Sequence, residues 1–205
     1  MAFLESVEKQ RIEAAIVAAE ESTSGELIAV VAGDADDYLY VSMMWAAMFS
    51  LALPGLMALL QFHSLHEHAY AIQIASFFVF AVVFRWRPLL LLMTPKALKY
   101  ERAHRLAVEQ FLSHNLHHTK ERTGVLIFVA VAERYIEIIA DKGINDAVGE
   151  DQWESIVDEF RSALHTGHTA EGFVTAIEAC GALLSDAFPP RAGDENELPD
   201  HLIEI

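Results

Sequence analysis

The side chains best suited to chemistry in this sequence are two groups of carboxylates. Asp34, Asp36 and Asp37 directly follow a short apolar segment, and Asp141 follows another one. Carboxylates at strand ends are common ligands of hard cations such as Ca²⁺ and Mg²⁺. We therefore predict a Ca²⁺ or Mg²⁺ site built from these four aspartates. The alternative is an ordinary polar loop. No other cofactor is indicated.

The histidines also come in groups. A predicted helix ends in His114, His117 and His118, whose spacing of three or four residues places two imidazoles on one face, as in a two-histidine metal site. These three are candidate transition-metal ligands, although histidines also favour helix C-termini for electrostatic reasons. A second group fills one short loop and titrates in the range of a pH sensor: His63, His66 and His68.

Several function classes find no support in the sequence. It contains no Walker loop, no dinucleotide-binding glycine motif and no nucleophile-elbow motif, so whether the chain is an enzyme stays open. The single cysteine, Cys180, lies in an apolar helical pattern and is expected in the core. A formal net charge of −16 repels phosphate backbones, so nucleic acid is not an expected partner.

The elements that must position these side chains follow from hydrophobic periodicity. The order of elements predicts one α/β sandwich with a small mixed sheet flanked by helices. Strand one comes before a long insertion and strands two and three come after it, so the single sheet is built from both sides of the insertion. The predicted helices are 3–21, Pro95–Leu116, Asn145–Leu164 and Ala170–Ala187, and the predicted strands are Glu26–Ala32, Val125–Ala132 and Tyr135–Ala140.

The insertion has no charged residue between Asp37 and Glu67. Its first apolar run, Val41–Phe62, is long enough as a helix to cross a hydrocarbon core of about 30 Å. Its second run, Ala69–Phe84, follows after a short loop, so we predict a two-helix transmembrane hairpin. The second helix either continues to Met93 or stops near Phe84. In the second case, which we favour, a new helix starts at Pro88 in the headgroup region.

Basic residues set the expected orientation of this hairpin. The loop between the two runs has neither lysine nor arginine. Just after the second run the chain has six basic residues: Arg85, Arg87, Lys96, Lys99, Arg102 and Arg105. By the positive-inside rule, both termini are expected in the cytoplasm of a bacterial inner membrane. The predicted organisation is a first domain segment (1–40), the hairpin (41–93), a second domain segment (94–188) and an acidic tail (189–205).

Three stretches of the sequence resemble the TPM domain family, and in particular a bacterial membrane-protein branch of it. They are Ser24–Val31 (SGELIAVV), Arg122–Val129 (RTGVLIFV) and Glu133–Ile144 (ERYIEIIADKGI), together with the tail motifs FPP and NELPD. The family groups thylakoid-lumen acid-phosphatase-like proteins, a photosystem II repair protein and a receptor-accessory protein. Here only Gly143 is kept of the G-x-G that members tend to carry after strand three.

Two functions follow as hypotheses. The first is a membrane-anchored accessory or scaffold module that binds another membrane protein or a second copy of itself, with the bilayer as a further partner. The alternative, which the resemblance implies, is a divalent-metal-dependent phosphatase-like hydrolase. Asp34, Asp36 and Asp141 would be its ligands and His114 or His118 its general acid.

Overall fold

The computed structural model describes residues 4–61, 68–119, 122–145, 147–190, 198 and 201–205. The chain divides into two compact units. An α/β unit comprises residues 1–35 and 100–205, and a helical unit comprises residues 36–99. The helical unit is therefore an insertion into the α/β unit, as the order of predicted strands required.

The α/β unit is built on a four-stranded sheet in the order β3-β2-β1-β4. The central strands β1 (Glu26–Ala32) and β2 (Gly124–Ala130) run parallel, and β3 (Tyr135–Ala140) is antiparallel to β2. All residues of β1 and β2 are buried, which follows from their continuous apolar sequences and from the helices that cover both faces. The two-residue strand β4 (Ile203–Glu204) pairs with β1 in parallel.

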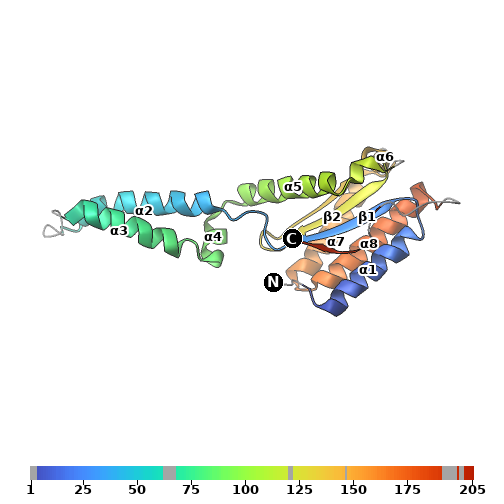
Figure 1. The fold of residues 1–205 in the computed structure, drawn as a ribbon, viewed down its shortest axis with the longest axis horizontal. Coiled ribbons are helices and arrows are strands. Elements are labelled where there is room, and N and C mark those ends of the chain that lie inside the picture. The colour runs from blue at the N-terminus through green and yellow to red at the C-terminus, as the bar shows by residue number, and fades with distance from the viewer. Residues whose placement is uncertain (1–3, 62–67, 120–121, 146, 191–197, 199–200) are drawn as a thin grey trace. The chain divides into compact units, whose positions relative to one another are not determined.

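Helices cover the two faces of this sheet unequally (Figure 1). One face packs against α1 (Ser6–Glu20), α7 (Glu150–His165) and α8 (Thr169–Ala187), and the other packs against α5 (Lys96–Ser113). Alternation along β1 divides the core accordingly. Leu27 and Ala29 point to the three-helix face, and Ile28 and Val30 point to the α5 face.

Two short helices lie at the end of the sheet where β2 starts and β3 ends. The 3₁₀ helix η2 (Leu116–His118) precedes β2, and its Leu116 carbonyl oxygen would lie 2.5 Å from a Cβ on Gly124. Only glycine fits at this close approach. The single-turn helix α6 (Lys142–Asn145) follows β3, where the backbone N–H of Asp141 donates to the Gly124 carbonyl at 2.9 Å.

The helical unit contains α2 (Leu39–Leu59), α3 (Ala69–Val83) and α4 (Arg87–Met93). Helices α2 and α3 pack together through Ala46, Ala81 and Phe84, with the Phe49 ring 5.4 Å from that of Phe84. By length and composition α2 is the one described helix able to span a membrane by itself. Helices α3 and α4 meet the same test only when taken together across a bend of 100°.

Most of the predicted elements are confirmed. Strands β1 and β3 have the predicted bounds, and the helix after Ala69 ends at Val83 with a new helix around Pro88, which is the boundary that we favoured. Pro54 lies inside an uninterrupted α2.

Some local predictions are wrong. Helix α7 starts at Glu150, with Gly149 as its N-cap, and Asn145, where we predicted the start, is the last residue of the separate helix α6. The pattern predicted Thr169 as the N-cap of the last helix, but Thr169 is the first residue of α8, whose N-cap is His168. The helical pattern also predicted Leu112 as a core residue, but it is half exposed, since α5 turns it away from the sheet. His63 and His66 lie outside the described residues, as does most of the tail before His201.

Candidate functional site

The four predicted metal-binding aspartates lie in different places. Asp34 follows the C-terminal end of β1, and Asp141 lies beside Gly124 at the start of β2. Because β1 and β2 are parallel and in register over seven residues, these two positions are at opposite ends of the sheet, roughly 20 Å apart. Asp34 and Asp141 therefore do not share a cleft.

The remaining carboxylates have local roles. The Oδ1 atoms of Asp36 and Asp37 accept hydrogen bonds from the backbone N–H groups of Tyr38 and Leu39, each at 3.0 Å, where the chain enters α2. Asp141 Oδ1 accepts the Lys142 N–H at 2.7 Å and so supports the first turn of α6. Short polar side chains commonly bond nearby backbone in this way. The Ca²⁺ or Mg²⁺ site stays a prediction.

The predicted histidine ligands lie at the C-terminal end of α5 and in η2. His117 and His118 lie on η2 with ring centroids 4.1 Å apart, and His114 directly follows α5. Burial lowers the pKa of His114, and the charge of His201 lowers it further. Within the described ranges, no three His, Cys, Asp or Glu side chains are placed to hold a metal ion. The hydrolase hypothesis therefore gains no assembled metal centre, and it too stays a prediction.

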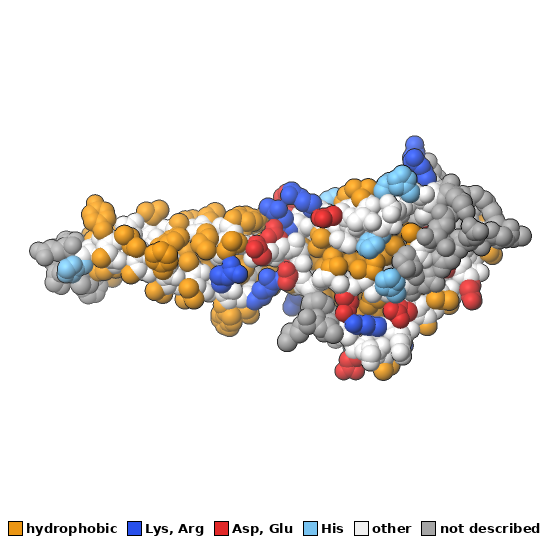
Figure 2. All heavy atoms as spheres, viewed as in Figure 1, with side chains coloured by type: hydrophobic (Ala, Val, Ile, Leu, Met, Phe, Trp, Pro, Cys, Tyr) orange, Lys and Arg blue, Asp and Glu red, His pale blue; other side chains and the backbone are white. Residues whose placement is uncertain are grey.

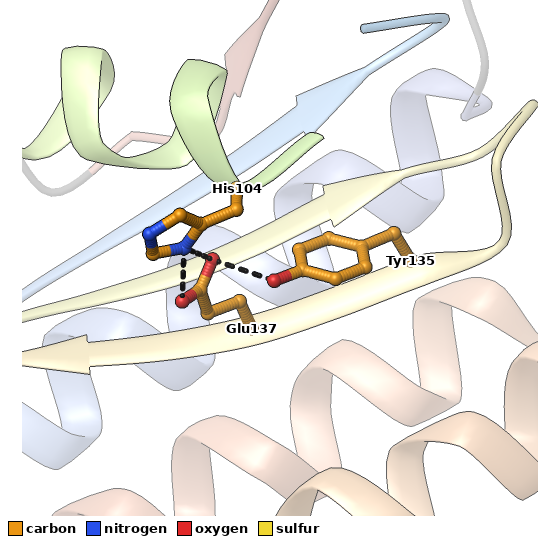
Figure 3. A network of polar contacts seen from close by, with 3 residues as sticks. All are labelled: His104, Tyr135 and Glu137. Carbon is orange, nitrogen blue, oxygen red and sulfur yellow. Dashed lines mark hydrogen bonds and ion pairs between the residues drawn. The ribbon is translucent and has the colours of Figure 1, made fainter. Parts of the chain in front are cut away.

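The sequence did not single out a polar network on the α5 face of β3 (Figure 3). His104 Nδ1 lies 2.8 Å from Glu137 Oε1 and 3.0 Å from Oε2. The Tyr135 hydroxyl donates to Glu137 Oε2 at 3.0 Å. Burial of Tyr135 raises the pKa of its phenol, and the Glu137 carboxylate raises it further. The alternation of Tyr135 and Glu137 along β3 was the only available signal, because His104 comes from another element.

This network fixes a carboxylate at the outer strand of the sheet. The Glu137 side chain is 20% exposed, so part of it faces solvent while two neighbouring side chains hold it in place. A carboxylate that is both oriented and accessible can accept a further hydrogen bond or pair with a cationic group. The arrangement suits recognition of a positively charged ligand.

A groove of about 520 Å³ lies on the opposite face of the same strand. Its apolar lining comes from β3 and α7 and includes Ile136, Ile138, Trp153 and Val157. Its polar lining includes Glu154 and the ion pair between Asp158 and Arg161. The indole N–H of Trp153 is buried and has no hydrogen-bond partner among the described residues. The groove therefore combines an apolar surface with an acidic margin.

Comparison with known proteins adds a family to this geometry. Residues 89–183 match the family model described as the TPM domain. The match includes α5, β2, β3, α7 and most of α8, and therefore both the polar network and the groove. It does not include β1, which forms the centre of the sheet.

One solved structure is similar to the chain over nearly its whole length. It is the NMR structure of the BA42 protein from the psychrophilic bacterium Bizionia argentinensis, with a TM-score of 0.63 and 23% sequence identity. The similarity covers 99% of this chain and 96% of that one. At this identity it supports the α/β fold alone. No curated protein matches the chain.

Proposed function

Since residues 89–183 of the chain match the TPM domain family model, we propose that the protein is a membrane-anchored accessory module. The helical unit anchors it in a bilayer, and the α/β unit binds a partner protein. The observation that carries this proposal is the surface of α2 and α3.

Helix α2 has the length and composition of a membrane span. It contains 21 residues, which corresponds to about 31 Å of helix, and it contains no charged residue. A hydrocarbon core is about 30 Å thick. Large apolar side chains on α2 and α3 stay exposed, among them Leu51 at 67%, Leu59 at 79% and Val82 at 74%. Figure 2 shows hydrophobic side chains over the visible face of these helices.

Such a surface is unfavourable in water. Monomeric soluble proteins rarely expose contiguous apolar patches larger than a few hundred Å². The two serines of α2 that are buried, Ser42 and Ser50, donate to carbonyl groups of their own helix, those of Leu39 and Ala47. Their hydroxyl donors are therefore satisfied within the helix, which is compatible with a lipid environment.

The break after α3 fits a position at the membrane surface. Helix α3 has 15 residues and by itself reaches about 22 Å, so as the second span it would need local thinning of the bilayer, as short spans do. Trp86, which is 68% exposed, lies at this break between Arg85 and Arg87. Tryptophan and arginine favour the headgroup level. In the proposed arrangement α4 lies in that region, and both termini are cytoplasmic, at the inner membrane of a bacterium.

Membrane fractionation with a matched pair of variants tests the anchor. After extraction with alkaline carbonate, the wild-type protein should stay with the membranes. Leu51→Arg places a charge in the middle of α2, which costs about 2.5–3.5 kcal/mol for insertion, so more protein should be released. Leu112→Arg is the control, because Leu112 is also an exposed leucine on a helix but belongs to the α/β unit.

The proposal fails if wild-type protein is released by carbonate, or if both arginine variants behave alike. A fusion of green fluorescent protein to the C-terminus tests the orientation separately. It should fluoresce in cells, whereas a C-terminal alkaline phosphatase fusion should be inactive. The opposite result would reverse the topology and keep the anchor.

A further inference from the structure

We propose that the free edge of β3, together with the groove between β3 and α7, binds an extended segment of a partner protein as a fifth strand. In this segment apolar residues alternate with lysine or arginine. The inference rests on the proposed function, since it identifies the surface and the chemistry with which the α/β unit would recognise its partner.

The backbone of β3 presents unused groups along its outer side. In an antiparallel pair, residues alternate between directing their N–H and C=O groups toward the neighbouring strand and away from it. The Asp141 N–H donates to the Gly124 carbonyl. Ile139 and Glu137 are two and four residues before Asp141, so their N–H and C=O groups also point toward β2. Ile138 and Ala140 are therefore directed outward. Asn145 Nδ2 confirms this, because it reaches the Ala140 carbonyl at 2.8 Å from outside the sheet.

No strand in the described ranges covers this outer side of β3. Asn145 closes one end of the edge, which leaves the N–H and C=O of Ile138 open for pairing. An exposed strand edge is a ready template for an added strand, and main-chain hydrogen bonds then provide much of the affinity.

The side chains beside this edge define what the added strand must look like. Ile136, Ile138 and Ala140 point to the groove face, where Trp153 and Val157 complete an apolar surface. Partner residues opposite Ile138 would point into this groove, and the residues between them would point to the face of Glu137.

Charge decides between the possible occupants. Glu137 lies on the face to which the lysine or arginine residues would point, and Glu154 and Asp158, the latter paired with Arg161, add negative charge at the margin of the groove. A second copy of this chain, with a net charge of −16, would bring further acid to the surface. A segment that carries lysine or arginine complements it instead, both for rate of association and for specificity.

The other edge of the sheet shows that this fold accepts such an addition. There the chain's own C-terminus pairs as β4 with β1, and Lys9 Nζ lies 2.7 Å from Glu204 Oε2. At that edge β4 has backbone pairing with β1, a buried apolar side chain (Leu202) and one charge pair. The β3 edge offers the same three kinds of contact to a strand from another protein.

Peptide binding to the full chain in mild detergent tests the proposal. The probe is a fluorescein-labelled eight-residue peptide in which lysine and valine alternate, measured by fluorescence anisotropy at 150 mM salt. A peptide of the same composition, with all lysines before all valines, keeps the charge and removes the alternation. The block peptide must place lysine in the apolar groove or valine on the Glu137 face, so we expect the alternating peptide to bind at least tenfold more tightly.

Two variants locate the site. Glu137→Gln removes the carboxylate that the lysines of the bound segment would face, and Glu159→Gln removes an exposed carboxylate of α7 outside the groove lining. The first should weaken binding by about threefold, as expected for a partly exposed charge pair, and the second should leave it within error. Equal affinity for both peptides, or equal effects of both variants, would overturn the assignment.

Hydrogen exchange measured by NMR gives an independent readout. In the free protein the Ile138 amide should exchange quickly, while the Glu137 and Ile139 amides, which bond to β2, should be protected. The alternating peptide should slow exchange at Ile138 alone among these three. If a chain that passes the carbonate test shows no such change, the β3 assignment fails and the membrane anchor stands. If the chain is released by carbonate, the anchoring function fails independently.

Discussion

The two edges of the four-stranded sheet are completed in different ways. At the β1 edge the chain's own C-terminus adds β4, the Ile205 N–H donates to Val31 O at 3.0 Å, and Leu202 is buried against the core. At the β3 edge the described residues provide one side-chain bond, from Asn145, and a partly open groove.

The difference follows from the sequences of the two strands. All residues of β1 are buried, so an exposed β1 edge would place continuous apolar sequence and unpaired backbone in water. Strand β3 carries Glu137 at its centre, and most of its residues are only partly buried. A charged, partly solvated edge can stay open without aggregating, and so it is the edge that can serve a partner.

The largest expected effect is loss of the buried anchor of β4. Leu202→Ala should lower the free energy of unfolding of the α/β unit by about 2–5 kcal/mol, because it removes a core side chain and leaves a cavity. The control Ile205→Ala truncates a side chain that is 46% exposed and keeps the backbone bonds of the same segment, so its cost should be far smaller. The urea midpoint of protease resistance measures both, and similar costs would mean that β4 is not anchored by Leu202.

A smaller effect is expected from the polar network on the open edge. Tyr135→Phe removes the hydrogen bond to Glu137 and should cost about 1 kcal/mol in the same assay. Tyr100→Phe is the control, since the Tyr100 ring lies 5.2 Å from that of Tyr135 and the change keeps this ring contact. A cost of more than 2 kcal/mol for Tyr135→Phe would show that the open edge depends on this network as strongly as the closed edge depends on Leu202.

Acidification should destabilise the β1 edge, where β4 pairs, more than the β3 edge. The pKa of His114 is lowered from its ordinary value of 6.5 by burial and then by His201, which directly precedes Leu202. The unfolded chain therefore takes up its proton first as the pH falls below 6.5, and the stability that His114 contributes above that pH is lost as the pH falls through its lowered pKa.

The measurement is the difference in urea midpoint between pH 7.5 and pH 5.5. His201→Gln removes one of the two causes and should reduce this difference, while Tyr135→Phe should leave it unchanged. If wild type and His201→Gln show the same change in urea midpoint, His201 does not affect the titration of His114.

The smallest expected effect concerns the ion pair beside β4. The Lys9 and Glu204 side chains are 30% and 23% exposed, so solvent screens their attraction. Lys9→Met should cost less than about 1 kcal/mol, and the cost should shrink in 0.5 M salt. Arg11→Met, which breaks the more exposed pair with Glu171, is the comparison. A larger or salt-independent cost for Lys9→Met would show that the Lys9 stem, rather than its charge, holds β4.

Much of the fold could be predicted from local pattern. The apolar run Glu26–Ala32 and the alternating run Tyr135–Ala140 have periodicities that specify strands regardless of context. Cys180 is fully buried as its helical pattern indicated, and burial raises the pKa of its thiol to about 12. Strand β4 could not be predicted from the sequence, because its two residues are too few to show a periodicity and pair only when β1 is already in place.

The predicted site residues depended on pairing that a sequence does not contain. Asp34 and Asp141 both follow strands, yet the parallel register of β1 and β2 sends them to opposite ends of the sheet. His104 and Glu137 are 33 positions apart and meet only because α5 lies over β3. The sequence thus determined which segments are strands, helices and apolar insertions, since these depend on neighbours within a few residues. Only the tertiary structure decided which edge is closed and which side chains meet, because those depend on how distant segments pack.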